Sequence, residues 1–166
     1  MWDFASFHGQ PRRGGVVGYE SRLKALLAVV VTALLGGCVG PARTSDDYAR
    51  KASTSIHDCR SAVETARLAV DAATGGRATT AYLSVLLGQA EEQAASVQST
   101  FESIQPPNAD ADRLREDVDA LLSDAVSLLA DLRIAARRED TDGLTSRGPE
   151  LKDVSDRLGT LENDLG

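Results

Sequence analysis

The sequence is poor in the side chains that carry most cofactor and ligand chemistry. Of its 166 residues, two are histidine, two are cysteine and one is tryptophan. Beyond Cys38 there is neither tryptophan nor methionine, and the aromatic residues are Tyr48, Tyr82 and Phe101. So few rings leave little surface on which a flat cofactor or ligand can stack. We therefore predict that the protein uses no cofactor.

Residue patterns typical of catalytic and metal sites are also missing from the sequence. His57 and Cys59 are two positions apart, so on a helix they point about 200° away from each other and cannot share a metal ion. There is no Glu-x-x-His pair for a di-iron bundle, no C-x-x-C-H haem attachment and no glycine loop for phosphate. The neighbouring Glu91 and Glu92 are typical of a solvated helix face. We expect no catalytic residue, no metal site and no enzyme activity.

Basic residues are scarce after the N-terminal region. The first 37 residues carry four basic and two acidic side chains, a net charge of +2, whereas the remaining 129 carry 14 and 23, a net charge of −9. This acidic excess argues against nucleic-acid binding, which depends on neutralising phosphates with a basic face. Arginine outnumbers lysine 15 to 3, and this usage indicates a GC-rich genome.

The chain also lacks a hydrophobic run long enough to cross a membrane comfortably. Its longest apolar stretch, residues 25–35, spans less than about 20 Å as a helix, whereas a bilayer needs about 20 residues. Arg22 and Lys24 precede this stretch and two small residues follow it, which completes the pattern of an export signal. We predict a signal peptide over residues 1–37. Residues before about 16 fit no such signal, and a start codon assigned too early would explain them.

The end of this signal reads Leu35-Gly36-Gly37-Cys38 and resembles the lipobox of bacterial lipoproteins. The resemblance implies cleavage after Gly37 and attachment of acyl chains such as palmitate to Cys38. The protein would then be anchored on the extracytoplasmic face of the cell membrane, and with its arginine usage it resembles an actinobacterial lipoprotein. Two alternatives stay open: an ordinary secretory signal with a coincidental cysteine, and an uncleaved membrane anchor.

After a short tether over residues 38–44, apolar residues recur at steps of three and four over residues 45–166. This spacing is typical of amphipathic helices, and we expect four, over residues 45–74, 78–104, 109–138 and 141–164. Thr44 or Ser45 caps the first, Asn108 caps the third, and Pro106-Pro107 stop the second. Gly148-Pro149 should kink the fourth or divide it. Arg113 and Arg115 each precede an aspartate by four positions, and we expect both pairs on the solvent face.

Short connections force neighbouring helices to run in opposite directions. The sequence therefore predicts an all-α fold, an antiparallel up-down-up-down four-helix bundle. A three-helix bundle with a loose C-terminal segment is the alternative, because the apolar stripe of the fourth helix is the weakest.

Two residues of the first helix have side chains that could be reactive. Cys59 lies on its apolar stripe, so we expect the thiol to be buried. His57 lies on its solvent-facing side, so we expect the imidazole to be exposed to water.

These observations favour a non-catalytic, membrane-anchored interaction or accessory module whose partner is an envelope protein. In a tethered bundle, Arg77, Arg137 and Arg138 would collect at the end farthest from the membrane, where they are candidate partner contacts. The alternative is a carrier lipoprotein with a small-ligand site between helices. That reading calls for a cavity above about 300 Å³ among the helices, with a charged residue facing into it.

Overall fold

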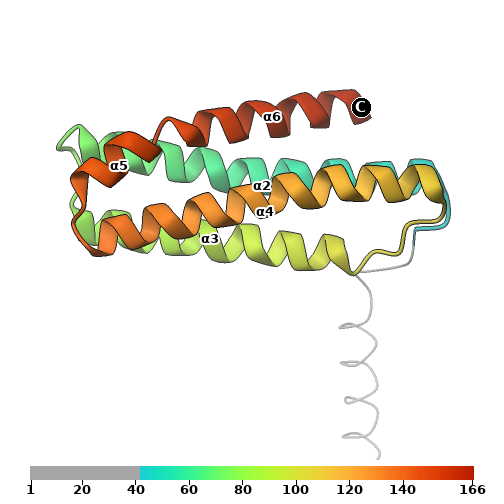
Figure 1. Ribbon diagram of the computed structural model, residues 1–166, viewed down its shortest axis with the longest axis horizontal. Coiled ribbons are helices and arrows are strands. Elements are labelled where there is room, and N and C mark those ends of the chain that lie inside the picture. Colours follow the sequence, from blue (N-terminus) through green and yellow to red (C-terminus); the bar gives the residue numbers. More distant parts are fainter. Residues whose placement is uncertain (1–41) are drawn as a thin grey trace, which may run out of the picture. The chain divides into compact units, whose positions relative to one another are not determined.

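The computed structural model describes residues 42–166, which form a bundle of helices (Figure 1). The helices are α2 (Ser45–Thr74), α3 (Thr80–Glu102), α4 (Ala109–Arg137), α5 (Thr141–Arg147) and α6 (Glu150–Leu165). Together, α5 and α6 form the fourth member of the bundle, and no strand occurs within residues 42–166. The prediction of an all-α domain built from four helical segments is confirmed.

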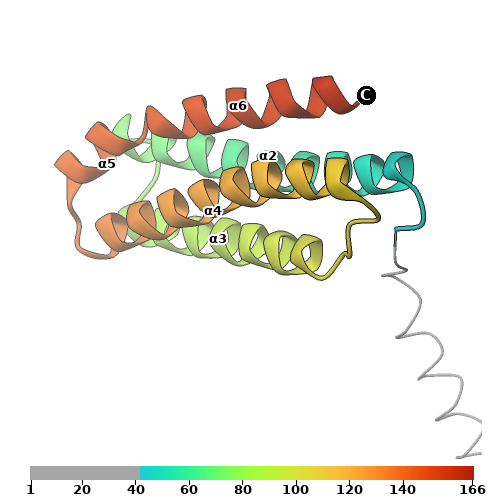
Figure 2. The same ribbon diagram turned by 45° about the vertical axis from the view of Figure 1, so that its right-hand side comes forward.

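Successive members of the bundle run in opposite directions along its length (Figure 1). The Nη2 of Arg115, near the start of α4, donates to the backbone carbonyl of Glu102 at the end of α3 over 3.0 Å. The side-chain amide of Asn108 donates to Oγ of Ser45 over 2.7 Å, which places the starts of α4 and α2 together. Figure 2 shows α5 and α6 lying along α2 and α4, on the side away from α3.

Side chains fix the starts of four helices by accepting hydrogen bonds from free backbone amides. Thr44 Oγ1 accepts from the amide of Asp47 over 3.1 Å, and Asn108 Oδ1 accepts from that of Ala111 over 3.0 Å. Thr79 and Asp140 cap α3 and α5 in the same way. The expected caps at Thr44 and Asn108 are confirmed, and α3 starts two residues later than expected because its cap is Thr79.

The apolar stripes meet in one core, as the sequence predicts. The largest fully buried side chains are Tyr48, Ile56, Val63, Leu83, Leu87, Phe101, Val118, Leu122, Leu129, Leu132, Leu151 and Leu158. The rings of Tyr48 and Phe101 pack with centroids 5.7 Å apart. Half-buried residues, Ala73, Leu86, Val97 and Leu161 among them, close the margins of the core.

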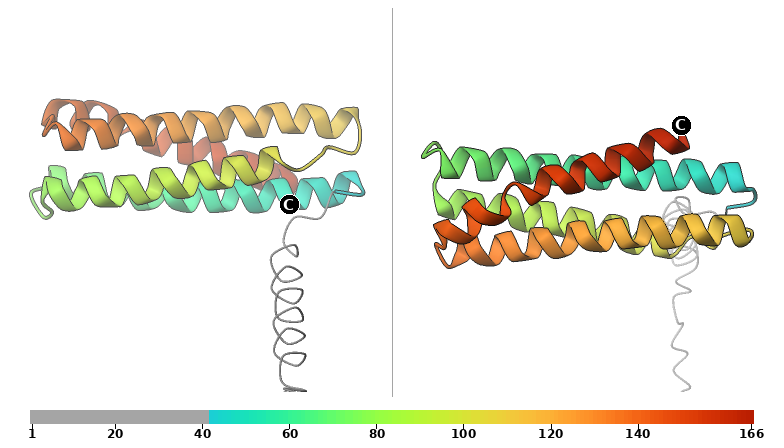
Figure 3. Two further views of the ribbon diagram at one scale, coloured as in Figure 1. Left: turned by 90° about the horizontal axis from the view of Figure 1, so that it is seen from below. Right: turned by 45° about the horizontal axis from the view of Figure 1, so that its top comes forward.

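The fourth member of the bundle is divided at Gly148-Pro149, one of the two expected outcomes. Proline has no backbone N–H to continue the helix, and a Cβ on Gly148 would lie 2.9 Å from the carbonyl oxygen of Leu144 and 3.0 Å from Val70 Cγ1. After the break, α6 crosses the bundle obliquely, from beside α4 toward α2 (Figure 3). Leu151 and Leu158 are fully buried, so the alternative of a loose C-terminal segment is wrong.

Among the residues that the structure describes, no helix combines the length and the hydropathy needed to cross a membrane.

We expect Leu132→Ala to lower the free energy of unfolding by about 2–5 kcal/mol, because it leaves a cavity in a close-packed core. Leu68→Ala removes the same atoms from a side chain that is 61% exposed and should cost less than about 1 kcal/mol. Urea denaturation followed by circular dichroism measures both values. Equal and small losses for the two variants would show that the face of α4 that bears Leu132 does not pack in a core.

Candidate functional site

The predicted lipobox residues Leu35, Gly36, Gly37 and Cys38 lie outside the described residues. Cleavage and lipidation there stay predictions. The described domain begins four positions after Cys38, at Ala42, whose side chain is buried. Any anchor at Cys38 is therefore joined to the bundle by very little chain.

The three candidate arginines belong to the turns at one end of the bundle. Arg77 follows α2, Arg137 is the last residue of α4 and Arg138 follows it, at the end where the α2–α3 and α4–α5 connections both lie (Figure 1). All three side chains are exposed. The α4–α5 turn also holds Glu139 and Asp140, and Asp142 lies at the start of α5, so three acidic residues offset the three arginines. This end is nearly neutral in a domain of net charge −9, rather than basic.

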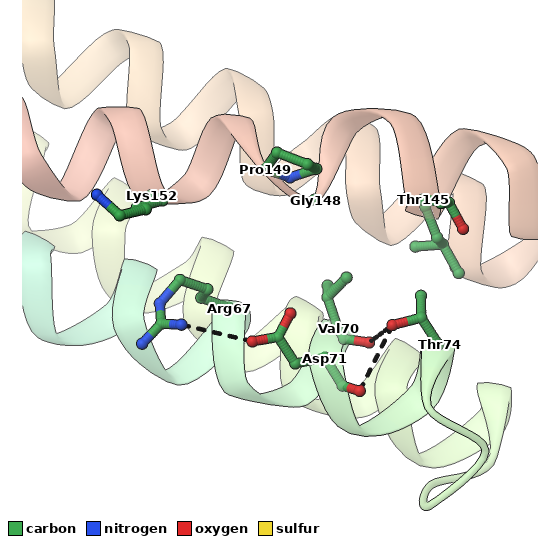
Figure 4. Close-up of a pocket in the computed structure, with 9 residues that line it drawn as sticks. Arg67, Val70, Asp71, Thr74, Thr145, Gly148, Pro149 and Lys152 are labelled. Atoms are coloured by element: carbon green, nitrogen blue, oxygen red, sulfur yellow. Dashed lines mark hydrogen bonds and ion pairs between the residues drawn. The ribbon is translucent and has the colours of Figure 1, made fainter.

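A first groove, of about 270 Å³, lies between the second half of α2 and the α5–α6 junction. Figure 4 shows Arg67, Asp71 and Thr74 on its α2 side, facing α5 and α6. Its polar groups already have partners: Arg67 pairs with Glu64 at 2.8 Å and with Asp71 at 3.4 Å, and Lys152 pairs with Asp156. The Thr74 hydroxyl donates to the carbonyl of Val70 over 2.9 Å. Few free polar groups remain to orient a small ligand here.

A second series of hollows follows the seam between α4 and the α5–α6 segment. The largest, of about 420 Å³, is lined by Asp117, Ala120, Leu121, Arg157, Thr160, Leu161 and Asp164. The next, of about 270 Å³, shares Arg157 with it, and a third, of about 180 Å³, shares Asp131 and Arg147 with the second. These shared residues make the hollows one continuous feature, which we call the α4–α6 groove.

The α4–α6 groove is a surface feature rather than an interior cavity. Most residues that line its largest hollow are exposed, and Leu121 and Leu161 form its apolar floor. Two ion pairs cross it, Arg157 with Asp124 at 2.9 Å and Arg147 with Asp131. The charged residues stand at the rim, so the groove does not match the enclosed ligand site that a carrier requires.

A further charged cluster joins α2 to α6. Glu162 Oε1 lies 3.0 Å from Nδ1 of His57, and Glu162 Oε2 accepts from Nη1 of Arg60 over 3.1 Å. The hydrogen bond with His57, together with that from Arg60, lowers the pKa of Glu162 against the opposing effect of desolvation. A Cβ on Gly159 would lie 3.1 Å from Cζ of Arg60, so the glycine leaves room for the guanidinium over α6.

The outcomes for the two singled-out residues of α2 differ. Cys59 is fully buried and free, and burial raises the pKa of its thiol to about 12, as suits an inert core residue. His57 is exposed as expected, at 65% of its side chain, but its contact with Glu162 gives it a tertiary partner that we did not foresee.

Two buried side-chain polar atoms lack a hydrogen-bond partner within residues 42–166: the Tyr48 hydroxyl and Asp119 Oδ1. Burial raises the pKa of Tyr48, and it also raises that of Asp119 against the influence of Arg115. Neither residue lines the grooves described above. No group of three or more His, Cys, Asp or Glu side chains in the described region is arranged to hold a metal ion.

Comparison of the chain with protein-family models, with curated proteins and with solved structures found no match.

Sequence reasoning missed the α4–α6 groove and the Glu162 cluster. The groove depends on the angle at which α6 crosses the bundle, and the spacing of apolar residues along the chain does not encode that angle. The cluster joins residues more than 100 positions apart. One signal was present, because Leu121 and Leu128 stand at the edge of an apolar stripe that Leu122 and Leu129 make unusually wide.

The lowered pKa of Glu162 makes its contribution to stability depend on pH. A carboxylate whose folded pKa is depressed stabilises the fold above its unfolded pKa, and this contribution is lost as the pH falls through the folded value. We therefore expect Glu162→Gln to destabilise the protein at neutral pH, and the difference from the wild type to shrink as the pH falls below 4.5.

Urea midpoints measured from pH 7 down to about pH 3 test this expectation. Glu92→Gln is the matched control, because Glu92 is exposed and has no ion pair within residues 42–166. If the urea midpoints of Glu162→Gln and the wild type differed by the same amount at every pH, the pKa of Glu162 would not be lowered in the folded protein.

Proposed function

We propose that the chain is a non-catalytic lipoprotein module, anchored through Cys38 on the extracytoplasmic face of the cell membrane, that binds a protein of the envelope. The observation that carries the proposal is the position of the lipobox-like Leu35-Gly36-Gly37-Cys38, directly before a helical domain that begins at Ala42. A lipid on Cys38 would attach to the domain itself rather than to a long linker.

This attachment would hold one end of the bundle at the membrane. Five residues separate Cys38 from the helix cap Thr44, which gives a reach of about 20 Å. The 30 residues of α2 rise about 45 Å. The turns that carry Arg77, Arg137 and Arg138 would stand at that distance from the start of α2, where a partner in the envelope can reach them.

The charge of the domain supports the same arrangement. Its 14 basic and 23 acidic side chains give a net charge of −9, which an anionic membrane surface repels. The sides of the bundle would then stay off the lipid and face outward, available to other proteins. A lipid-anchored domain that the membrane surface repels is suited to binding other proteins rather than to lying against the lipid.

The competing proposal, a carrier for a small ligand, has weaker support. The largest hollow of the α4–α6 groove exceeds 300 Å³, but it opens on the surface between α4 and α6, and its charged residues Asp117, Arg157 and Asp164 are exposed at the rim. Ligand sites usually enclose most of the ligand and place a few polar groups inside. Ser55, Ser155, the Tyr48 hydroxyl and one carboxylate oxygen of Asp119 are buried in the described domain, but none of these residues lines this hollow.

We expect Cys38→Ala to abolish membrane attachment through lipid. In detergent phase partitioning, the wild type should enter the detergent phase, while the variant moves to the aqueous phase or accumulates as the uncleaved precursor. Mass spectrometry of the N-terminal peptide distinguishes these products. Identical partitioning of both proteins into detergent with residues 1–37 still attached would instead indicate a membrane-spanning anchor.

The arginine-bearing end of the bundle is a second element of the proposal. If Arg77 and Arg138 contact an envelope protein, reversing both to Glu should remove that protein from the set crosslinked to the chain in native membranes. The matched control is Arg113→Glu, which changes an exposed arginine at the opposite end of α4. Unchanged crosslinks with folding intact by circular dichroism would leave this end without a role.

A further inference from the structure

We propose that the α4–α6 groove binds an amphipathic helix of a partner protein, with apolar residues along one face and lysine or arginine beside them. This inference rests on the proposed function and gives the partner's chemistry.

The apolar face of α4 is wider than its neighbours cover. Leu122, Leu129 and Leu132 are fully buried, and Leu121, Leu128 and Ala135 lie at the margin of the core with 8%, 7% and 7% of their surface exposed. Farther along the same side, Ile134 is 38% exposed. The incompletely covered residues lie at the floor of the hollows between α4 and the α5–α6 segment.

The spacing of this floor fits a helix. Leu121, Leu128 and Ala135 recur every seven residues on α4, and Val154 and Leu161 do so on α6. A seven-residue repeat is the spacing at which side chains of a further helix interdigitate with a helical face. The lining from α4 and its C-cap runs from Asp117 to Arg138, about 32 Å, which accommodates about 20 residues of helix.

An extended segment fits this groove less well. Both walls are helices whose backbone N–H and C=O groups bond internally, so they offer no edge to a strand. A buried extended peptide would leave its own backbone polar groups without partners. A helix satisfies them itself and presents only side chains to the groove.

Charge decides what kind of helix fits. Six acidic and three basic side chains line the groove, a net charge of −3. Arg147 and Arg157 already pair with Asp131 and Asp124. No ion pair within residues 42–166 engages Asp117, Glu150 or Asp164, which stand along the rim. These carboxylates attract basic residues beside an apolar face, and they repel a second copy of this domain, whose net charge is −9.

Site-specific photocrosslinking in intact cells tests the proposal. Benzoylphenylalanine replaces Thr160 in the groove or, as a control position, Tyr82, an exposed aromatic residue on α3. We expect adducts from position 160, and mass spectrometry should map the crosslinked site to a segment with helical apolar spacing and basic flanks. Detergent partitioning of the same protein measures the anchor separately, so a failure to crosslink from an anchored chain is distinct from a failure of the anchor.

Paired charge reversals complete the test at position 160. Asp117→Lys with Asp164→Lys should lower the adduct yield about tenfold, since two attractions become repulsions. Asp58→Lys with Glu92→Lys makes the same change of charge at exposed positions outside the groove and should leave the yield unchanged. Circular dichroism melting confirms that each variant folds.

Several results would overturn the proposal. They are equal yields from the two double variants, adducts that form at position 82 but not at 160, an adduct with an acidic segment, and an adduct that joins two copies of this chain or contains residues 1–37.

Discussion

Burial of the apolar face of α4 is the constraint that the other helices satisfy. Its fully buried side of Val118, Leu122 and Leu129 needs close neighbours. On α2, alanines such as Ala52, Ala62 and Ala66 are buried, and small side chains allow backbones to approach. This explains how α2 contacts α4 although the two helices are not consecutive. The larger side chains of α3, Leu83, Leu87 and Phe101 among them, fill the remaining side of the core.

The part of the apolar face of α4 that α2 and α3 do not cover packs against α6, which covers it incompletely. The break at Gly148-Pro149 redirects the chain, and the fit of Gly148 against Val70 fixes where that redirection takes place. Beyond it, Leu151, Val154 and Leu158 enter the core while the helix crosses toward α2. Gly159, Arg60 and Glu162 hold its second half to α2. The groove beside α4 is a consequence of this oblique crossing.

The sequence predicted the features that depend on residues close together in the chain, namely the helices, two of their N-terminal caps and the break in the fourth segment. Periodicity located the helices, Thr44 and Asn108 marked two starts, and Gly148-Pro149 marked the break. The choice of ion-pair partner was predicted less well, even within one helix. Arg113 pairs with Asp110 rather than with Asp117. Arg115 does pair with Asp119, but it is only one-third exposed and also binds the end of α3, so the prediction of a solvent-face pair was incomplete. The choice among such partners depends on side-chain rotamers and on the distance to the next helix, which local spacing does not encode.

The proposed binding of a partner helix in the α4–α6 groove would cost little stability, because the ion pairs that cross the groove are weak and the core beneath them is strong. Its two crossing ion pairs are about half exposed: the side chains of Arg157 and Asp124 are 56% and 52% accessible, and those of Arg147 and Asp131 are 47% and 49%. Exposed pairs contribute less than about 1 kcal/mol each, because water screens them and ordering two long side chains costs entropy. The burial of Leu151 and Leu158 that holds α6 in place is worth more, about 1.5–3 kcal/mol for each side chain. A binding helix can therefore displace the bridges over the floor of the groove while the core that positions α4 and α6 stays intact.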